Sequence, residues 1–121
     1  MTPEGRIQSH LMKLVKAVGG FCRKLAWEGR AGAPDLIIII NGKIVFVEVK
    51  RPGGKPKPHQ VREHERMAKR GADVRVIDNI HDADLLVADL VASSYSVSVA
   101  TKEASYELLQ RMGQTRGSMA A

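Results

Sequence analysis

The sequence predicts an α/β fold, in which a mixed β-sheet is flanked by helices. Apolar residues recur at helical spacing near the N-terminus, a strongly β-branched hairpin follows, and helix-like and strand-like segments then alternate. A length of 121 residues, with 44% apolar and 26% charged residues, is typical of one globular domain. No apolar run approaches the roughly 20 residues that cross a bilayer, and no secretion signal is visible, so we expect a cytoplasmic protein.

The first predicted element is a helix from Glu4 to Val18, because its apolar residues share one helical face and Gly19-Gly20 supplies a stop. Phe21 to Trp27 is a short candidate strand. A basic, glycine-containing loop then covers residues 28–34.

The central prediction is a β-hairpin. Asp35 to Ile40 and Lys43 to Lys50 are dense in β-branched residues, and Asn41-Gly42 between them is a favoured pair for a tight primed turn. Both faces of these strands are apolar near the turn, which predicts a central sheet covered by helices on both sides.

The downstream segments alternate in the same way. Residues 51–58 form a loop, Pro58 to Arg70 a helix, Asp73 to Asp78 a strand and Asp82 to Ala92 an apolar helix. The tail is weaker, with a candidate strand at 95–99, a helix near 103–112 and frayed last residues. We therefore interpret residues 1–92 as the domain and 93–121 as a C-terminal extension, partly helical.

Two carboxylates are predicted to meet across the hairpin. With a two-residue turn, Ile40 faces Lys43, and counting back along both strands places Asp35 opposite Glu48. Lys50 then points to the same side as Glu48, because side chains alternate along a strand. Like charges this close are compatible with a shared cation, and Mg²⁺ or Mn²⁺ is the natural candidate. Such a site would hydrolyse phosphodiester bonds.

Two alternatives stay open at this point. A longer turn would slip the register and separate the acids. Alternatively, Asp35, Glu48 and Lys50 would be solvated charges at strand ends that form an ordinary surface ion pair.

The chain resembles the VRR-NUC family of PD-(D/E)XK nucleases, especially its short stand-alone members in phages and prophages. The matching residues are Glu4 in the first helix, Gly32-Ala33-Pro34-Asp35, Phe46-Val47-Glu48-Val49-Lys50 and Gln60. The resemblance covers roughly residues 4 to 90 and implies a restriction-endonuclease-like core in a bacterial or phage-encoded protein.

The resemblance also implies roles for these residues. Asp35, Glu48 and the backbone carbonyl of Val49 would bind metal, with Glu4 as a further carboxylate. Lys50 would be the catalytic lysine, and Gln60 would reach the site from its helix. Without the resemblance, Glu4 is only an acid that favours a helix N-terminus, and Gln60 is a solvent-facing helical residue.

The charge balance favours a polyanionic partner. Nineteen Lys and Arg residues against thirteen acids give +6. Arg30, Arg51, Lys55 and Lys57 flank the predicted site on flexible loops and are candidate phosphate contacts, although each alone could be a solvated charge. Aromatic residues make up only 4%, which favours duplex or branched DNA over binding by base stacking.

We predict a structure-selective endonuclease for branched DNA such as four-way (Holliday) junctions. We also expect a homodimer, because stand-alone members of the family resemble junction resolvases and a two-fold protein suits a two-fold substrate. The alternatives are a sequence-specific restriction-type endonuclease and a non-catalytic DNA-binding module. The histidines show no metal-ligand spacing, no nucleotide-binding loop is present, and Cys22 is interpreted as a buried filler.

Overall fold

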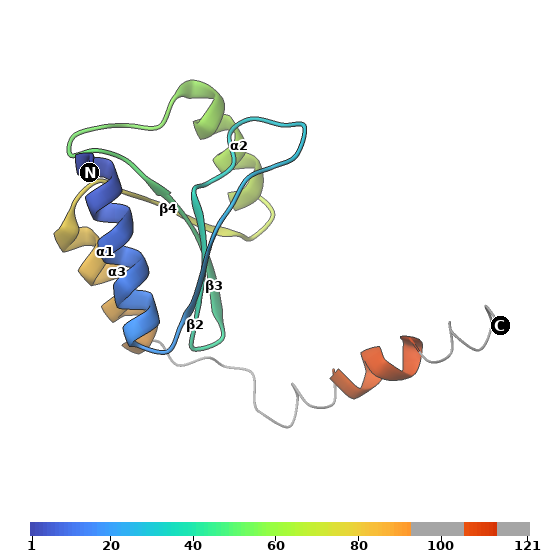
Figure 1. The fold of residues 1–121 in the computed structure, drawn as a ribbon. Coiled ribbons are helices and arrows are strands. Elements are labelled where there is room, and N and C mark those ends of the chain that lie inside the picture. Colours follow the sequence, from blue (N-terminus) through green and yellow to red (C-terminus); the bar gives the residue numbers. More distant parts are fainter. Residues whose placement is uncertain (93–105, 114–121) are drawn as a thin grey trace.

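The computed structural model describes residues 1–92 and 106–113 (Figure 1). The helices and strands of the first range are α1 (Pro3–Ala17), β1 (Phe21–Lys24), β2 (Leu36–Ile40), β3 (Lys43–Val49), α2 (Pro58–Ala68), β4 (Asp73–Ile77) and α3 (Ile80–Ala92). Residues 106–113 are helical. Within these two ranges, no helix is both long and apolar enough to pass through a membrane.

The strands form one mixed sheet in the order β1-β2-β3-β4. β1, β2 and β3 are successive antiparallel neighbours, whereas β4 runs parallel to β3. A parallel neighbour requires a crossover connection, and α2 provides it between β3 and β4 (Figure 1). The predicted mixed sheet with flanking helices is therefore confirmed.

The hairpin between β2 and β3 has the predicted two-residue turn. Ile40 lies opposite Lys43, and Asn41 and Gly42 have φ values of 53° and 79°, both in the left-handed region that a primed turn requires. The register holds along the whole ladder as far as Leu36 opposite Val47. The next facing positions are Asp35 and Glu48, so no register slip separates the two acids.

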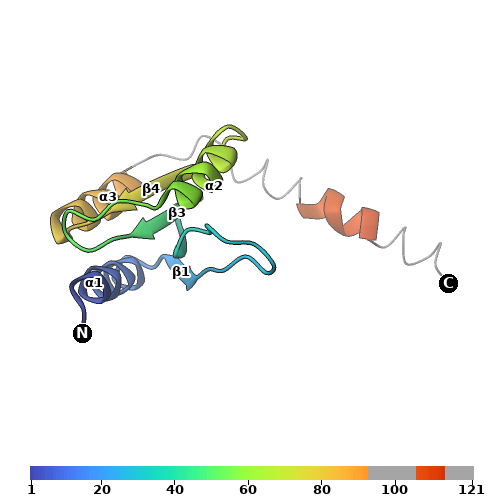
Figure 2. The same ribbon diagram turned by 90° about the horizontal axis from the view of Figure 1, so that it is seen from above.

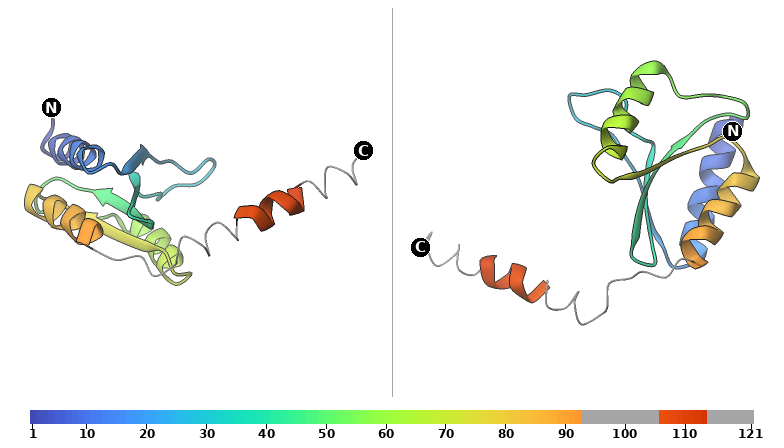
Figure 3. Two further views of the ribbon diagram at one scale, coloured as in Figure 1. Left: turned by 90° about the horizontal axis from the view of Figure 1, so that it is seen from below. Right: turned by 180° about the vertical axis from the view of Figure 1, so that it is seen from behind.

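The hydrophobic core lies between the sheet and the pair of helices α1 and α3, which lie side by side on one face of the sheet (Figures 1 and 3). Alternation along the strands sends every second side chain into this layer. The buried apolar residues are Ile7, Leu11, Val15, Leu36, Ile38, Ile40, Val45, Val47, Val49, Ile77, Ala83, Leu86, Val87 and Leu90.

α2 lies on the opposite face of the sheet (Figure 2), and it covers only the end away from the turn between β2 and β3 (Figure 1). α2 has 11 residues and packs mainly beside β4, so it leaves the hairpin tip open. Ile44, near the turn, is 52% exposed. The prediction that helices cover both faces near the turn is therefore confirmed for the α1 and α3 face and wrong for the other.

Most predicted boundaries are close to the observed ones. β1 is shorter than predicted and ends at Lys24. α3 begins two residues earlier than predicted, because the Asn79 side chain accepts a hydrogen bond from the backbone of Asp82 at 2.7 Å and caps the helix. Residues 106–113 are helical, in agreement with the helix predicted near 103–112. The predicted start of that helix at 103–105, the predicted strand at 95–99 and the last residues, 114–121, lie outside the described residues.

Candidate active site

Asp35 stands at the entrance to β2, where the ladder with β3 ends. Its Oδ2 accepts a hydrogen bond from the backbone N–H of Val49 at 2.8 Å, and its backbone oxygen accepts one from Leu25 at 2.8 Å. The side chain thus satisfies a strand N–H that would otherwise lack its ladder partner. These contacts fix Asp35 between the ends of β1 and β3.

Glu48 lies at the neighbouring position of β3 and is only 1% exposed. Its Oε2 accepts hydrogen bonds from Lys50 Nζ at 2.8 Å and from Gln60 Nε2 at 2.9 Å. Its Oε1 is buried and has no hydrogen-bond partner within residues 1–92 and 106–113. A buried carboxylate oxygen without a partner costs free energy, so this atom is suited to an external cation or water.

Gln60, in the first turn of α2, ties the helix to the end of β3. Its Oε1 accepts hydrogen bonds from Lys50 Nζ at 2.9 Å and from the backbone N–H of Lys57 at 2.8 Å. The amide must therefore present its NH₂ to Glu48, which fixes its orientation. Glu48, Lys50 and Gln60 form a closed triangle of contacts.

The electrostatics of Glu48 reflect competition between burial and charge. Burial raises the pKa of Glu48 above its ordinary value, and the negative charge of Asp35 raises it further. The hydrogen bond and charge of Lys50, together with the nearby His64, act in the opposite direction without cancelling the rise in pKa. Two carboxylates against one ammonium leave an excess of negative charge that a divalent cation would neutralise.

The sequence prediction missed two buried residues beside this site. Glu63 and His64 are each 8% exposed and lie on α2 three and four residues after Gln60, so all three share one helical face. This spacing in the sequence could have indicated that Glu63 and His64 lie beside Gln60 in the site. Burial alone would raise the pKa of Glu63, but hydrogen bonds and charges from Arg66 and Arg30 hold that pKa below its usual range.

Glu63 also holds the loop before Asp35 against α2. Arg30 Nε lies 3.3 Å from Glu63 Oε1, and Arg66 Nη1 lies 3.1 Å from that oxygen. Gly32 has a φ of +99°, and a Cβ there would lie 3.0 Å from the Glu63 Cβ and 3.1 Å from the His59 carbonyl oxygen. Only glycine suits this backbone and this approach.

The predicted DNA-binding residues are exposed around the site. Arg51, Lys55 and Lys57 lie in the loop between β3 and α2, which is tied to the end of β4 by a 3.2 Å hydrogen bond from Gly53 N–H to Asp78. Arg30 is 56% exposed although it pairs with Glu63. The structure leaves all four available to phosphate, and their role stays a prediction.

Glu4 is not gathered with the other acids. It is exposed in the first turn of α1, and across the described ranges no three His, Cys, Asp or Glu side chains cluster as a metal-binding set. Val49, whose carbonyl is a predicted ligand, lies at the end of β3 with its N–H bonded to Asp35. The structure therefore joins Asp35, Glu48, Lys50 and Gln60 at one end of the sheet.

Comparison with known proteins gives consistent matches. The family model described as "VRR-NUC domain" matches residues 4–79. The chain is 44% identical over 86 residues to "Putative nuclease p44" of Acyrthosiphon pisum secondary endosymbiont phage 1, covering 70% of this chain and 92% of that protein. A solved structure titled "VRR_NUC domain" superposes with a TM-score of 0.69 at 50% identity, covering 73% of this chain and 97% of the other.

Proposed function

The chain belongs to the VRR-NUC family, and we propose that it is a nuclease that hydrolyses DNA phosphodiester bonds with a divalent metal ion, Mg²⁺ or Mn²⁺. The observation that carries the proposal is the buried Glu48 carboxylate, which shares its environment with Asp35 while Lys50 and Gln60 hold one of its oxygens. A buried, charged group with a perturbed pKa is typical of a functional site.

The side chains present are compatible with such an ion. Hard cations take oxygen ligands, and Mg²⁺ is commonly held by one or two carboxylates with water and substrate phosphate completing the shell. Glu48 Oε1 has no hydrogen-bond partner among the described residues, and only one oxygen of Asp35 is used by Val49. In this proposal Asp35 and Glu48 hold the ion, with the Val49 carbonyl as a further candidate ligand. Glu4 does not cluster with these two acids, so it would join the ion only if α1 or the DNA brought it closer.

A bound ion would lower the pKa of a coordinated water and polarise the scissile phosphate. Lys50 supplies a positive charge at the same place, where it would stabilise negative charge that develops on the phosphate oxygens during attack. In the hydrolysis a water oxygen bonds to phosphorus, the bond from phosphorus to one sugar oxygen breaks, and that oxygen gains a proton. Gln60 positions Lys50, because its Oε1 accepts a hydrogen bond from the ammonium group.

We further propose that the enzyme prefers branched DNA and acts as a homodimer. Arg51, Lys55 and Lys57 are exposed beside the site and would contact phosphates without reading bases. Exposed apolar side chains on α3, with Leu85 at 53% and Val91 at 49%, provide surface that a second copy would cover. A two-fold protein suits a substrate with two-fold symmetry.

A cleavage assay tests the proposal. The full chain is incubated with a four-way junction, a flap and a linear duplex in the presence of Mg²⁺, Mn²⁺ or EDTA. We expect cuts in the branched substrates with either metal and none in EDTA. Cuts at one sequence in linear duplex would instead indicate a restriction-type enzyme. Binding without cutting under every condition, with Glu48→Ala equal to wild type, would indicate a passive module.

The dimer is tested separately by sedimentation equilibrium. A mass of twice the chain, reduced to one chain by Leu85→Glu, would support the use of α3. A wild-type chain that stays a monomer at micromolar concentration, alone and with junction DNA, would overturn the dimer without affecting the assignment of the active site.

A further inference from the structure

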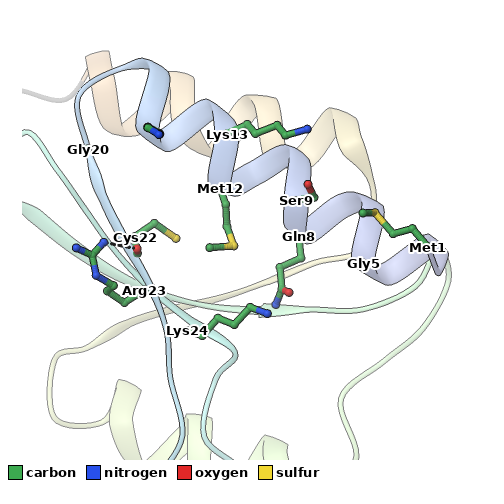
Figure 4. A pocket seen from close by; sticks show the side chains of 11 residues that line it. Met1, Gly5, Gln8, Ser9, Met12, Lys13, Gly20, Cys22, Arg23 and Lys24 are labelled. Atoms are coloured by element: carbon green, nitrogen blue, oxygen red, sulfur yellow. Dashed lines mark hydrogen bonds between the residues drawn. The ribbon is translucent and has the colours of Figure 1, made fainter.

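A groove of about 780 Å³ lies between α1 and the edge strand β1 (Figure 4). Met12 and Cys22 point into it from the two walls, and Gln8 and Lys24 approach each other across one end (Figure 4). Cys22 packs against the hydrophobic core but is only partly buried, so its interpretation as a buried filler is confirmed only in part. The groove is lined by α1 and β1, whereas Glu48 contacts Gln60 of α2.

The walls of the groove carry positive charge and no acid. The charged side chains that line it are Lys13 and Lys16 from α1, and Arg23 and Lys24 from β1. Within the described ranges, none of these three lysines takes part in an ion pair. Arg30, Arg66 and Arg75, by contrast, each face a carboxylate. Unneutralised cations along a concave wall favour a polyanionic occupant.

The shape of the groove depends on one glycine. A Cβ at Gly20 would lie 2.7 Å from Ile40 Cγ1 and 2.8 Å from Val15 Cγ1, so only glycine lets β1 approach the end of α1 this closely. β1 is an edge strand that pairs only with β2 among the described strands, which leaves outward backbone N–H groups available. Backbone N–H groups and lysines are common partners of DNA phosphates.

The groove ends beside the candidate active site. Leu25, directly after Lys24, donates its backbone N–H to the Asp35 carbonyl at 2.8 Å. Lys24 itself lies opposite Leu36, the residue after Asp35. A nucleic-acid backbone that passes the Asp35 and Glu48 pair and turns around the end of β1 would therefore enter the groove.

We propose that this groove binds the phosphate backbone of the DNA that flanks the scissile bond, with Lys13, Lys16 and Lys24 as its phosphate contacts. The proposal rests on the nuclease function proposed above and adds a second binding surface to it. The apolar side chain of Met12, on the α1 wall, would contact the sugar edges of the strand. Such a contact would fix how DNA crosses the site without reading its sequence.

Binding to charge-altered variants is the first test. Fluorescence anisotropy with a labelled four-way junction in EDTA compares Lys13→Gln/Lys16→Gln with the matched control Lys69→Gln/Arg70→Gln, which removes two exposed cations at the end of α2. We expect the groove variant to bind about tenfold more weakly, with a salt dependence reduced by about 2 in slope. Equal affinity and equal slope for the two variants would overturn the proposal.

Cys22 supplies a second test, because it is the only cysteine of the chain and lines the groove. The rate of its alkylation by a neutral maleimide is measured at fixed pH with and without saturating junction DNA. We expect bound DNA to slow alkylation at least about fivefold, because it would cover the thiol and block access of the reagent. An unchanged rate with saturating DNA would place the DNA elsewhere and overturn the proposal.

Failure of the groove and failure of the nuclease proposal are distinguishable. A protein that cleaves DNA with Mg²⁺ but shows an unprotected Cys22 and unchanged binding by the lysine variant has the proposed function without the groove contact. A protein that protects Cys22 and loses affinity on lysine substitution, yet never cuts DNA, has the groove contact without the chemistry.

Discussion

The two faces of the sheet bury different kinds of side chain. The face toward α1 and α3 buries only apolar side chains, whereas the face toward α2 holds the three buried polar residues of the described ranges, Glu48, Glu63 and His64. β3 serves both, since Val47 and Val49 are fully buried on one side and Glu48 lies on the other. One strand thus contributes to stability and to chemistry through alternate residues.

The two faces contribute differently to the free energy of folding. Burial of apolar surface stabilises the fold by about 25 cal/mol per Å², so the α1 and α3 face supplies the driving force for folding. Burial of a charged group is costly unless it is paired, and the Glu48 and Lys50 contact offsets that cost only in part. Substitutions on the two faces should therefore separate activity from stability.

The largest effect is expected for Glu48→Gln on the polar face. The variant keeps the shape of the side chain but removes the charge that would hold the metal ion. We expect the cleavage rate of a four-way junction with Mg²⁺ to fall by about 10³-fold, equivalent to about 4 kcal/mol in activation free energy. Cleavage within tenfold of wild type would show that Glu48 is not a metal ligand.

On the apolar face, Leu36→Ala is expected to affect stability instead. Leu36 is fully buried, and its truncation should lower the free energy of unfolding by about 2–5 kcal/mol, measured by urea denaturation. Cleavage per folded molecule at low temperature should stay within a few-fold of wild type. Loss of activity in a variant that circular dichroism shows to be folded would mean that the two faces are not separable.

Gly32→Ala probes the connection between the loop and α2. The positive φ and the close approach to Glu63 and His59 predict a destabilisation of about 1–3 kcal/mol, with a displaced loop and slower cleavage. Gly29→Ala is a matched control, because Gly29 also has a positive φ but no neighbour within 4 Å. Equal losses in the two variants would show that only the backbone conformation matters.

The smallest effect is expected for Asp73→Asn at the exposed edge of the sheet. The hydrogen bond from Arg75 holds the pKa of Asp73 below its ordinary value. Because this pKa is lower in the folded than in the unfolded chain, the ionised Asp73 stabilises the fold at pH values above the pKa of the unfolded state. This stabilisation is lost as the pH falls through the pKa of the folded state. The free energy of unfolding of the variant, measured by urea denaturation, should be lower than that of wild type by at most about 1 kcal/mol at pH 7, and the difference should shrink below pH about 4. A constant deficit would contradict this.

The elements of the hairpin were predictable from local sequence. The β-branched runs and Asn41-Gly42 fix the turn, and the turn fixes the register that brings Asp35 opposite Glu48. Alternation along each strand then determines to which face of the sheet each side chain points. Local patterns in the chain are therefore sufficient to place Asp35, Glu48 and Lys50 together.

Contacts that depend on how separate elements pack could not be predicted in this way. The burial of Glu63 depends on where α2 settles and on the pairing with Arg30 from a distant loop. The exposure of Ile44 depends on the short reach of α2 across the sheet. The groove beside Cys22 requires the approach of β1 to α1 that Gly20 allows. These features arise from tertiary geometry, which local patterns do not encode.

The most direct test of the shared metal site is isothermal titration calorimetry of Mn²⁺ into the wild-type chain, Asp35→Asn and Glu48→Gln. We expect saturable binding to wild type and its loss in each variant, while all three proteins stay folded in far-ultraviolet circular dichroism. Undiminished Mn²⁺ binding by both variants would contradict it.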